Sequence, residues 1–509
     1  MRRFFALSVC FALIPATAHA EWLEARTDHF VLTINDTQEN ARRFAERLER
    51  FDGAIRRLYG VADDPDQHLR PLAIYALSDR LFQDTCACSL AVGYYESHIK
   101  QSVIFTLHMP VADRKAPIGG WSSQMVLLHE YSHHFAFNNF PIAYPKWFSE
   151  GFAEFNATAG FEPDGSVVIG YPANYRAEAI FNGGLSLYQL FEPERAGLSV
   201  YNIDAFYGRG WLLTHYLMLS RPRAGQLSRY LDLVNRGNSG MQAAKLAFGD
   251  LKALNKELSA YSHQLAPQLR ISPGRKAITV TMRQLSPGEA AMIPVYARMR
   301  SGIPGGQGAG LAQKAAGIAR RYPNDPAVQS EWAEIEYAAG RLAKALEAAD
   351  TALRLNPQSV DALVVKGTVT SDVLFKAKSR DHNDWQGARD WLLKANRADP
   401  NAVMPLFQYY STFLREGVSP SAGAVKGLMR AAVLAPESSS VRALVAREML
   451  LTGDAASARA LLQPLAFAPH TQRDDNLPLQ LIQLIDARRI EDAKQLVMSK
   501  TDEDPKKSR

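Results

Sequence analysis

The stretch LLHEYSHHF, residues 127–135, places three histidines and one glutamate within nine residues. His129 and His133 lie four positions apart, and side chains at i and i+4 lie one above the other on a helix, so both imidazoles can reach one metal ion. Glu130 projects beside them, where it can take a proton from a water at that metal. The pattern predicts a zinc site on a helix over residues 122–137. The alternative is a half-buried amphipathic helix whose histidines are incidental.

A second helix downstream can supply the further ligand, because a catalytic zinc site combines three protein ligands with an open position. The segment NNFPIAYP, residues 138–145, contains the Asn and Pro residues that end the first helix. The next segment, WFSEGFAEFNAT, predicts a helix over residues 147–158. This helix carries two carboxylates, Glu150 and Glu154, one helical turn apart.

The two helices together resemble the gluzincin metallopeptidases, in which HExxH is followed by a helix that reads W-x-x-E-G-x-A. The matching residues are Trp147, Glu150, Gly151 and Ala153. The resemblance covers residues 21–265 and implies an α+β, thermolysin-like metallopeptidase domain. The arrangement looks closest to the bacterial peptidase MA-like group, which also pairs such a domain with helical repeats. It implies one Zn²⁺ per chain as the cofactor and a peptide or protein as the substrate.

The resemblance also implies a role for each residue of the motifs. It makes His129, His133 and Glu150 the zinc ligands and Glu130 the general base. Glu154 follows Glu150 by one turn, where many gluzincins place a carboxylate that orients a ligand histidine. The alternative for Glu154 is a solvated helix glutamate.

A tyrosine further along the chain is a candidate for a second catalytic residue. Residues 207–210, YGRG, resemble the Y-x-K-G stretch of aminopeptidase N-like enzymes, whose tyrosine hydrogen-bonds the developing oxyanion. Tyr207 would then act beside Glu130, whereas a tyrosine in an apolar helix can also be a core residue. His134 points about 100° away from His133 around the helix and is not expected to be a ligand.

One departure from the aminopeptidase pattern bears on substrate choice. Those enzymes carry G-x-M-E-N on the strand before the zinc helix, and its glutamate grips the free amine of the substrate. This chain has GYYES at residues 93–97, so Gly93 and Glu96 are in register but Met and Asn are absent. The departure argues against exopeptidase specificity. The natural substrate and the cleavage preference stay open.

The C-terminal region is rich in Ala and Leu and contains a repeated spacing. Small residues at fixed places let paired helices approach closely, and a proline ends the second helix. Together with Gly340 and Gly453 in mid-repeat, the spacing resembles the tetratricopeptide repeat over residues 306–500, with four or five repeats. An unrelated helical bundle is the alternative. The three sets that share the spacing are Ala345, Ala352 and Pro357; Ala388, Ala395 and Pro400; and Ala424, Ala431 and Pro436.

Two further segments complete the predicted organisation. Residues 266–305 contain several Pro and Gly residues and are predicted to be a linker between the peptidase-like domain and the all-α solenoid. Residues 501–509 form a charged tail.

The first twenty residues predict export. Two arginines precede an apolar run over residues 4–14, and AHA at residues 18–20 supplies the small residues of a cleavage site. This pattern is typical of a secretory signal peptide over residues 1–20. The run is too short to span a bilayer, which makes a membrane anchor the weaker interpretation. The mature protein is expected in the periplasm or the medium.

Two cysteines, Cys86 and Cys88, follow the signal segment. In an oxidising compartment they can pair across one intervening residue, or they can remain free thiols. They are too few to form a metal site of their own.

The composition excludes several other classes of protein. The contents of 47% hydrophobic and 22% charged residues are typical of soluble globular chains. The net charge of +6 is a mild excess, and no run of Lys and Arg interleaved with aromatics predicts a nucleic-acid surface. No later stretch approaches the length of a membrane span.

These observations predict an exported zinc metallopeptidase whose repeat solenoid binds a protein partner or presents substrate. Two other functions stay open. The chain can be an envelope scaffold or adaptor whose repeats bind a partner and whose zinc domain is inert. Alternatively, the zinc domain can be an amidase that acts on cell-wall peptides.

Overall fold

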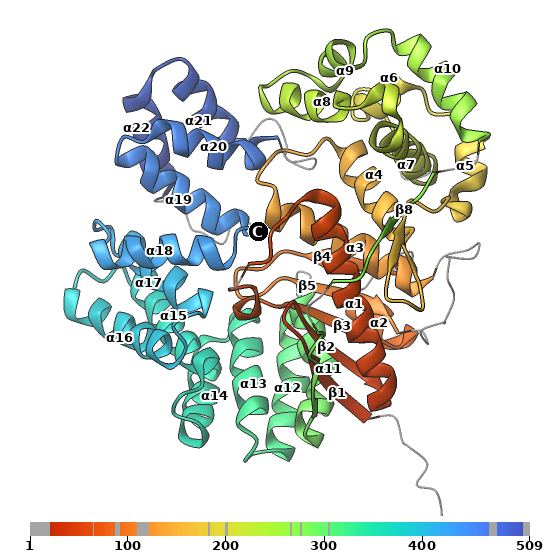
Figure 1. The fold of residues 1–509 in the computed structure, drawn as a ribbon. Coiled ribbons are helices and arrows are strands. Elements are labelled where there is room, and N and C mark those ends of the chain that lie inside the picture. Colours follow the sequence, from red (N-terminus) through yellow and green to blue (C-terminus); the bar gives the residue numbers. More distant parts are fainter. Residues whose placement is uncertain are drawn as a thin grey trace, which may run out of the picture.

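A mixed β-sheet forms the centre of the N-terminal half of the chain (Figure 1). Its strands lie in the order β4-β5-β3-β2-β1-β9. Strands β2, β3 and β5 are parallel to one another, whereas β1, β4 and β9 run antiparallel to their neighbours. In this computed structural model the strands are β1 Glu21–Arg26, β2 Phe30–Asp36, β3 Leu72–Leu77, β4 Gly93–Glu96, β5 Val103–Leu107 and β9 Thr281–Gln284.

The predicted signal peptide, residues 1–20, lies outside the residues that the structure describes, as do residues 502–509 of the predicted tail. The described residues are 21–64, 66–86, 92–108, 122–181, 184–198, 202–264, 267–274, 277–303, 306–467 and 476–501.

Strand β3 is buried on both faces, and this explains why its sequence, LAIYAL, is apolar throughout. Successive side chains of a strand point to opposite faces of the sheet. Leu72, Ile74 and Ala76 therefore join the hydrophobic core on one face. The alternate side chains join a second cluster on the other face.

Helices α1 (Gln38–Tyr59) and α3 (Ser123–Asn139) pack on the first face, and α4 (Lys146–Ala157) packs against α3. The side chain of Thr37 caps the start of α1, and Gly60 ends this helix with a φ of 67°, a conformation that glycine adopts readily. The two helices predicted over residues 122–137 and 147–158 are confirmed. Side chains of α1 at helical spacing enter the core, namely Phe44, Leu48, Phe51 and Ile55.

Helices α2 (Asp79–Cys86) and α11 (Pro287–Arg300) cover the opposite face of the sheet. Strand β9 and helix α11 both fall within residues 266–305, the predicted linker. The Pro and Gly residues of this segment suggested a loop, but TMRQ in β9 pairs with β1. The Ser286 and Glu289 side chains then form a capping box that starts α11.

Shorter elements between α4 and β9 complete the N-terminal half. A small sheet has the order β6-β7-β8. Its strands are β6 Gly160–Phe161, β7 Val167–Ile169 and β8 Leu269–Ile271. The helices are α5 Ala177–Phe181, α6 Leu187–Phe191, α7 Ile203–Leu219, α8 Gln226–Asn235, α9 Gly240–Phe248 and α10 Leu251–Ser262.

From α11 onward the described chain consists of helical hairpins, in which each odd-numbered helix packs against the next helix. The odd-numbered first helices α11, α13, α15 and α17 also contact one another in series. We refer to this array as the solenoid. Its further helices are α12 Gly308–Arg321, α13 Pro326–Ala338, α14 Leu342–Leu355, α15 Val360–Lys376, α16 His382–Ala398, α17 Val403–Glu416, α18 Ala422–Leu434, α19 Ser439–Leu451, α20 Ala455–Ala466, α21 Leu477–Asp486 and α22 Ile490–Thr501.

The repeated alanines of the sequence lie on second helices of the hairpins and have no exposed surface. Their small side chains allow close packing against the neighbouring helices. Gly340 and Gly453 occupy the turns inside two hairpins with φ values of 75° and 93°, which other residues rarely adopt. The packing fits a TPR-like helical repeat. The buried alanines are Ala345, Ala352, Ala388, Ala395, Ala424 and Ala431.

The solenoid curves around one side of the sheet, with α11–α14 beside its lower strands and α19–α22 at the upper left in Figure 1. Its first helix and a helix near its other end both contact the N-terminal half. In α11, Arg298 Nη1 donates to the carbonyl oxygen of Thr85 at 2.8 Å. In α20, Gln463 Nε2 donates to Asn235 Oδ1 at 3.2 Å. The solenoid therefore follows the N-terminal half along most of its own length.

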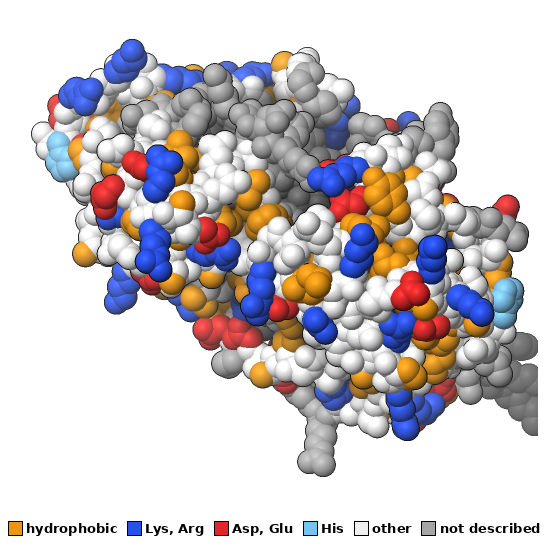
Figure 2. Space-filling view, turned by 90° about the horizontal axis from the view of Figure 1, so that it is seen from above, with side chains coloured by type: hydrophobic (Ala, Val, Ile, Leu, Met, Phe, Trp, Pro, Cys, Tyr) orange, Lys and Arg blue, Asp and Glu red, His pale blue; other side chains and the backbone are white. Residues whose placement is uncertain are grey.

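Three expectations from the sequence concern the charge of the surface, membrane spans and the cysteines. Figure 2 shows Lys and Arg side chains interspersed with Asp and Glu over the described part of the face that it presents. In the described part of the chain, none of the helices combines the length and the hydropathy of a membrane span. Cys86 is disulfide-bonded, whereas Cys88 lies outside the described residues.

Candidate metal centre

Helix α3 carries the HExxH motif and is anchored by its apolar side. It begins after Ser122, whose side chain accepts a hydrogen bond from the backbone N–H of Met125. Leu128, Tyr131 and Phe135 are between 1% and 2% exposed and belong to the core. Because these residues fix the rotation of the helix, the two motif histidines point toward α4 rather than into the sheet.

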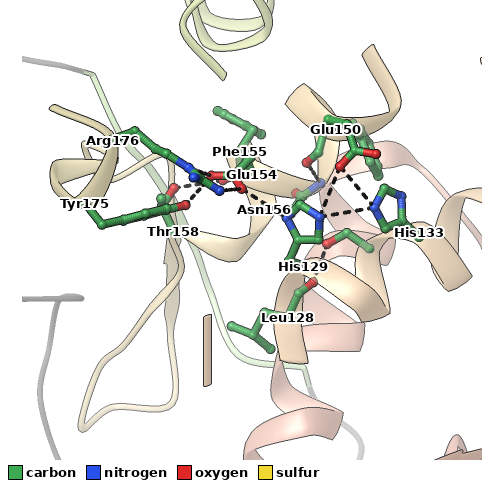
Figure 3. A network of polar contacts seen from close by, with 12 residues as sticks. Leu128, His129, His133, Glu150, Glu154, Phe155, Asn156, Thr158, Tyr175 and Arg176 are labelled. Carbon is green, nitrogen blue, oxygen red and sulfur yellow. Dashed lines mark hydrogen bonds and ion pairs between the residues drawn. The ribbon is translucent and has the colours of Figure 1, made fainter. Parts of the chain in front are cut away.

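His129 and His133 on α3 and Glu150 on α4 bring their polar atoms together (Figure 3). The Nε2 atoms of the two histidines are 3.2 Å apart. Glu150 Oε2 lies 3.3 Å from His129 Nε2 and 3.6 Å from His133 Nε2. One ligand atom from each residue lies within 4.8 Å of the others. The structure thus places the three predicted ligands in one cluster.

The electrostatics of the cluster favour a positive charge at its centre. Burial opposes protonation of His129, but Glu150 and Glu154 outweigh this effect and raise the pKa of His129 to about 10. Burial likewise opposes ionisation of Glu150, yet the facing imidazoles hold the pKa of Glu150 well below its usual range. A proton or a metal ion can supply the charge that this arrangement attracts.

The donor atoms of this cluster fit a zinc ion. The buried Oε2 atom of Glu150 accepts no hydrogen bond, although it faces two imidazole nitrogens. Two histidines and one glutamate, with a position left open, form a known ligand set of catalytic zinc. Magnesium and calcium prefer oxygen ligands alone. The residues present would therefore hold Zn²⁺ or a similar transition metal.

Among the described residues, a second group of side chains that could bind a metal ion has two of its three members on α1. It consists of His29, Glu49 and Asp52. His29 bridges the two carboxylates, with 2.7 Å to Glu49 and 3.3 Å to Asp52. Asp52 also accepts hydrogen bonds from Arg56 and from Tyr131. Since cations and donors already satisfy these carboxylates, the group holds α1 against α3 and does not resemble a metal site.

Glu154 lies behind His129, on the side away from Glu150 (Figure 3). Its Oε1 atom is 3.3 Å from His129 Nδ1, and the side chain has no exposed surface. Arg176 Nη2 donates to Glu154 Oε1 at 2.9 Å, and the hydroxyl of Tyr175 donates to Oε2. Although burial opposes ionisation, His129 and Arg176 lower the pKa of Glu154 to about 2. Glu154 is therefore a buried, ionised partner of His129 and not a solvated glutamate.

Glu130 is held by the edge of the large sheet. Strand β4 is the last strand in the sheet order, so alternate N–H groups point outward from its edge. One of them, the backbone N–H of Tyr95, donates to Glu130 Oε2 at 2.9 Å. The negative charge of Glu130 also contributes to the raised pKa of His129. Glu130 thus lies beside the three predicted ligands without joining their cluster.

Tyr207 reaches the cluster because α7 crosses α4 at two glycines. A Cβ atom on Gly151 would lie 2.5 Å from the carbonyl oxygen of Gly210, so neither position has room for a side chain. The Tyr207 ring stacks on His129 with 5.9 Å between centroids. Burial and then the nearby charge of Glu150 raise the pKa of Tyr207 above its usual range. The hydroxyl therefore stays protonated at neutral pH.

Two other residues named from the sequence lie away from the cluster. His134 is buried beside Tyr95, with 3.4 Å between its Nδ1 atom and the Tyr95 hydroxyl, and burial lowers the pKa of His134 to about 3. Glu96 pairs with Val103 and so shares the face that α11 covers. It lies 3.3 Å from His98 and does not face α3. This position gives no support to recognition of a substrate amine by Glu96.

Sequence reasoning missed two contributors to the centre. Arg176 neutralises Glu154, but a single arginine in NYRAEA follows no spacing rule relative to the zinc motif. Tyr95 contributes its backbone N–H, which every residue except proline carries. Only the position of GYYE as an edge strand could have indicated this contact.

Comparisons with known proteins leave the family open. No family model matches this chain, and no curated protein matches it. Among solved structures, the crystal structure of a thermophilic TPR protein in Thermus thermophilus is similar, with a TM-score of 0.28 and 20% identity. The similarity covers 37% of this chain and 91% of that chain.

Proposed function

We propose that this chain is an exported zinc metallopeptidase of the gluzincin class that hydrolyses peptide bonds. The observation that carries the proposal is the convergence of His129, His133 and Glu150 in a buried cluster, with Glu130 beside it. The donor set and its attraction for positive charge support a catalytic zinc site with one open position.

The residues around the ligands support the same chemistry. When bound, Zn²⁺ acts as a Lewis acid and lowers the pKa of a coordinated water to about 7. Glu130 accepts the proton of the attacking water and passes it to the leaving amine. The Oε1 atom of Glu154 lies 3.3 Å from His129 Nδ1, so this carboxylate can orient the ring with Nε2 toward the cluster.

Tyr207 supplies a hydrogen-bond donor beside His129 and Glu150. Because its pKa is raised, the hydroxyl keeps its proton at neutral pH. A donor placed where negative charge develops on the substrate carbonyl oxygen stabilises the transition state more than the ground state. This role is part of the proposal.

The solenoid and the disulfide bond support the other two parts of the proposal, which are protein binding and export. We assign a protein-binding role to the solenoid, because stacked helical hairpins offer extended surfaces to a partner or a substrate. The disulfide bond of Cys86 supports an oxidising compartment, in agreement with a signal peptide over residues 1–20.

The proposal is tested on the full chain with the variant Glu130→Gln. We expect about one zinc per wild-type chain and cleavage of an unbiased peptide library. The amide cannot take a proton from water, so Glu130→Gln should retain zinc and lose about 10²- to 10⁴-fold in rate. The exposed Glu347 on α14 provides the matched control, and Glu347→Gln should cleave like wild type.

Other results of this experiment would favour the scaffold function or the amidase function. Full zinc content without cleavage of any amide would favour a scaffold whose repeats bind a partner. Cleavage confined to cell-wall peptides would favour the amidase. Unchanged turnover in Glu130→Gln would place the catalytic base elsewhere.

A further inference from the structure

The loop between β4 and β5, residues 97–102, lies against the first helices of the solenoid, and we call it the sheet loop. Lys100 at its tip contacts three hairpins that are far apart in sequence. Its Nζ atom lies 3.1 Å from the Tyr296 hydroxyl of α11, 2.8 Å from Glu334 of α13 and 2.8 Å from Asp361 of α15. One cation of the N-terminal half is therefore shared by three repeats.

The neighbours of Lys100 in the sheet loop also contact the solenoid. The side chain of Ile99 packs against the hydrophobic cluster of α17–α19. Arg300 Nη2 donates to the carbonyl oxygen of Gln101 at 2.6 Å. Ser102 Oγ donates to Glu437 Oε1 at 2.7 Å. An apolar side chain, a cation and a backbone carbonyl of the sheet loop each contact a complementary group of the solenoid, as the groups of a bound peptide do.

The ion pairs of Lys100 are half-buried, because its side chain is 29% exposed and those of Glu334 and Asp361 are 16% and 42% exposed. Burial opposes the charge of Lys100, but Asp361 and Glu334 outweigh it and raise the pKa of Lys100. Exposed pairs contribute little, whereas removal of one partner from a buried pair leaves an uncompensated charge. The solenoid therefore holds the sheet loop through several contacts together, namely the half-buried ion pairs of Lys100, two further hydrogen bonds and the packing of Ile99.

The sheet loop continues directly from the strand that contacts the catalytic base. Strand β4 ends at Glu96, one residue before the loop, and Tyr95 in this strand donates its backbone N–H to Glu130. On its other side β4 pairs with β5, its one partner among the described strands. A shift of the loop would move the end of β4 and with it the donor to Glu130.

We propose that the solenoid is a structural part of the catalytic centre, with Lys100 as the positioning residue that fixes β4 and so the carboxylate of Glu130. This inference rests on the proposed function for its effect on catalysis. The inner surface of α11–α19 is then occupied by the chain's own loop. A protein partner would bind elsewhere on the solenoid.

The test uses full-length Lys100→Met, which keeps the length of the side chain and removes its charge. We expect faster hydrogen–deuterium exchange in peptides that cover residues 92–97, a fall in kcat of about 10- to 100-fold, and little change in KM. Zinc affinity should be unchanged, because no ligand contacts the sheet loop. Lys100→Arg, which retains the charge, should restore most of kcat.

Lys366→Met is the matched control. Lys366 pairs with Asp350 inside the solenoid and does not touch the sheet loop, so exchange in β4 and kcat should stay at wild-type values. If Lys100→Met fails to fold, Ile99→Ala weakens the same contact through the apolar cluster.

The outcomes separate this inference from the proposed function. Wild-type kcat in a Lys100→Met protein with faster exchange in β4 would overturn the positioning role, and so would unchanged exchange. If the wild-type chain binds zinc but cleaves nothing, the proposed function fails. The exchange of residues 92–97 then still decides whether the solenoid holds β4.

Discussion

His129 contacts a carboxylate through each of its ring nitrogens, and this arrangement determines which nitrogen can bind a metal. Its Nδ1 atom faces Glu154 and its Nε2 atom faces Glu150. Since His129 and Arg176 keep Glu154 ionised, its negative charge favours a proton on the Nδ1 atom that faces it. The two glutamates of α4, one turn apart, thus have different tasks.

This difference predicts different effects on metal binding. Glu150→Ala removes a proposed ligand and should abolish tight zinc binding. Glu154→Ala removes the partner of a ligand and should weaken zinc affinity about 10- to 100-fold. Competition with a chelator measures both affinities, and melting temperatures confirm that both variants fold. Retention of zinc by Glu150→Ala together with its loss in Glu154→Ala would shift the third ligand by one helical turn.

Tyr207→Phe removes a hydroxyl and keeps the ring that stacks on His129. If the hydroxyl serves the developing oxyanion, kcat should fall about 10²- to 10³-fold with little change in KM. Zinc content should not change. Tyr216→Phe is the matched control, because the Tyr216 hydroxyl donates to Glu257 on α10. Full activity in Tyr207→Phe would remove Tyr207 from the mechanism.

Among the residues of the metal centre, the sequence predicts those whose positions follow a spacing rule. His129 and His133 follow from the i, i+4 geometry of a helix, and Glu150 follows from a motif on the next helix. Arg176 and the Tyr95 backbone could not be predicted in this way. Their contribution depends on tertiary contacts between segments that no local pattern connects.

The crossing of α4 and α7 is the element-scale feature that assembles the centre. Gly151 and Gly210 let the two helices approach until backbone contacts backbone. Helix α7 thereby brings Tyr207 to a cluster formed by α3 and α4. The Gly residues of the EGFAE and YGRG stretches have a steric role as well as a place in the motifs.

Gly210→Ala should therefore destabilise the protein. The new Cβ atom would lie 2.9 Å from the Trp147 carbonyl oxygen, so α7 must move away from α4. Overpacking of this kind lowers the free energy of unfolding by about 1 to 3 kcal/mol. Gly387→Ala on α16 is the control, because its Cβ would meet nothing within 4 Å and should stabilise the helix slightly. Denaturant unfolding of both variants measures the difference.

Long helices could be predicted from the sequence, whereas short or distant elements could not. The helix α1 has clear apolar spacing and caps at both ends. Strand β9 has only four residues, and its partner β1 lies at the other end of the N-terminal half. The local composition favours a loop in this segment, but pairing with the distant strand β1 makes it a strand.

In the whole molecule, the N-terminal half and the solenoid contact each other at several separate places. Arg298 contacts Thr85, Lys100 contacts Glu334, and Gln463 on α20 contacts Asn235. The repeated spacing of alanines predicts how hairpins stack on one another. It contains no information on what lies against the inner helices, so the enclosure of the sheet could not be predicted.

The extent of these contacts predicts how the chain unfolds. We expect the sheet and the solenoid to unfold in one calorimetric transition, because loss of either exposes the surface that the other covers. Unfolding followed by tryptophan fluorescence and by helical circular dichroism should give the same midpoint. Two separated transitions in the wild-type chain would show that the contacts contribute little.

The pairing of β9 with β1 has a consequence for how the protein can be divided. Thr281 and Arg26 are hydrogen-bonded although they are 255 positions apart. During synthesis, the outer edge of β1 stays open until residue 284 has been made, and an open edge can pair with another chain. A fragment that stops at residue 265 would keep this edge permanently exposed and should aggregate. Attempts to express the metal centre alone should therefore include the chain through β9.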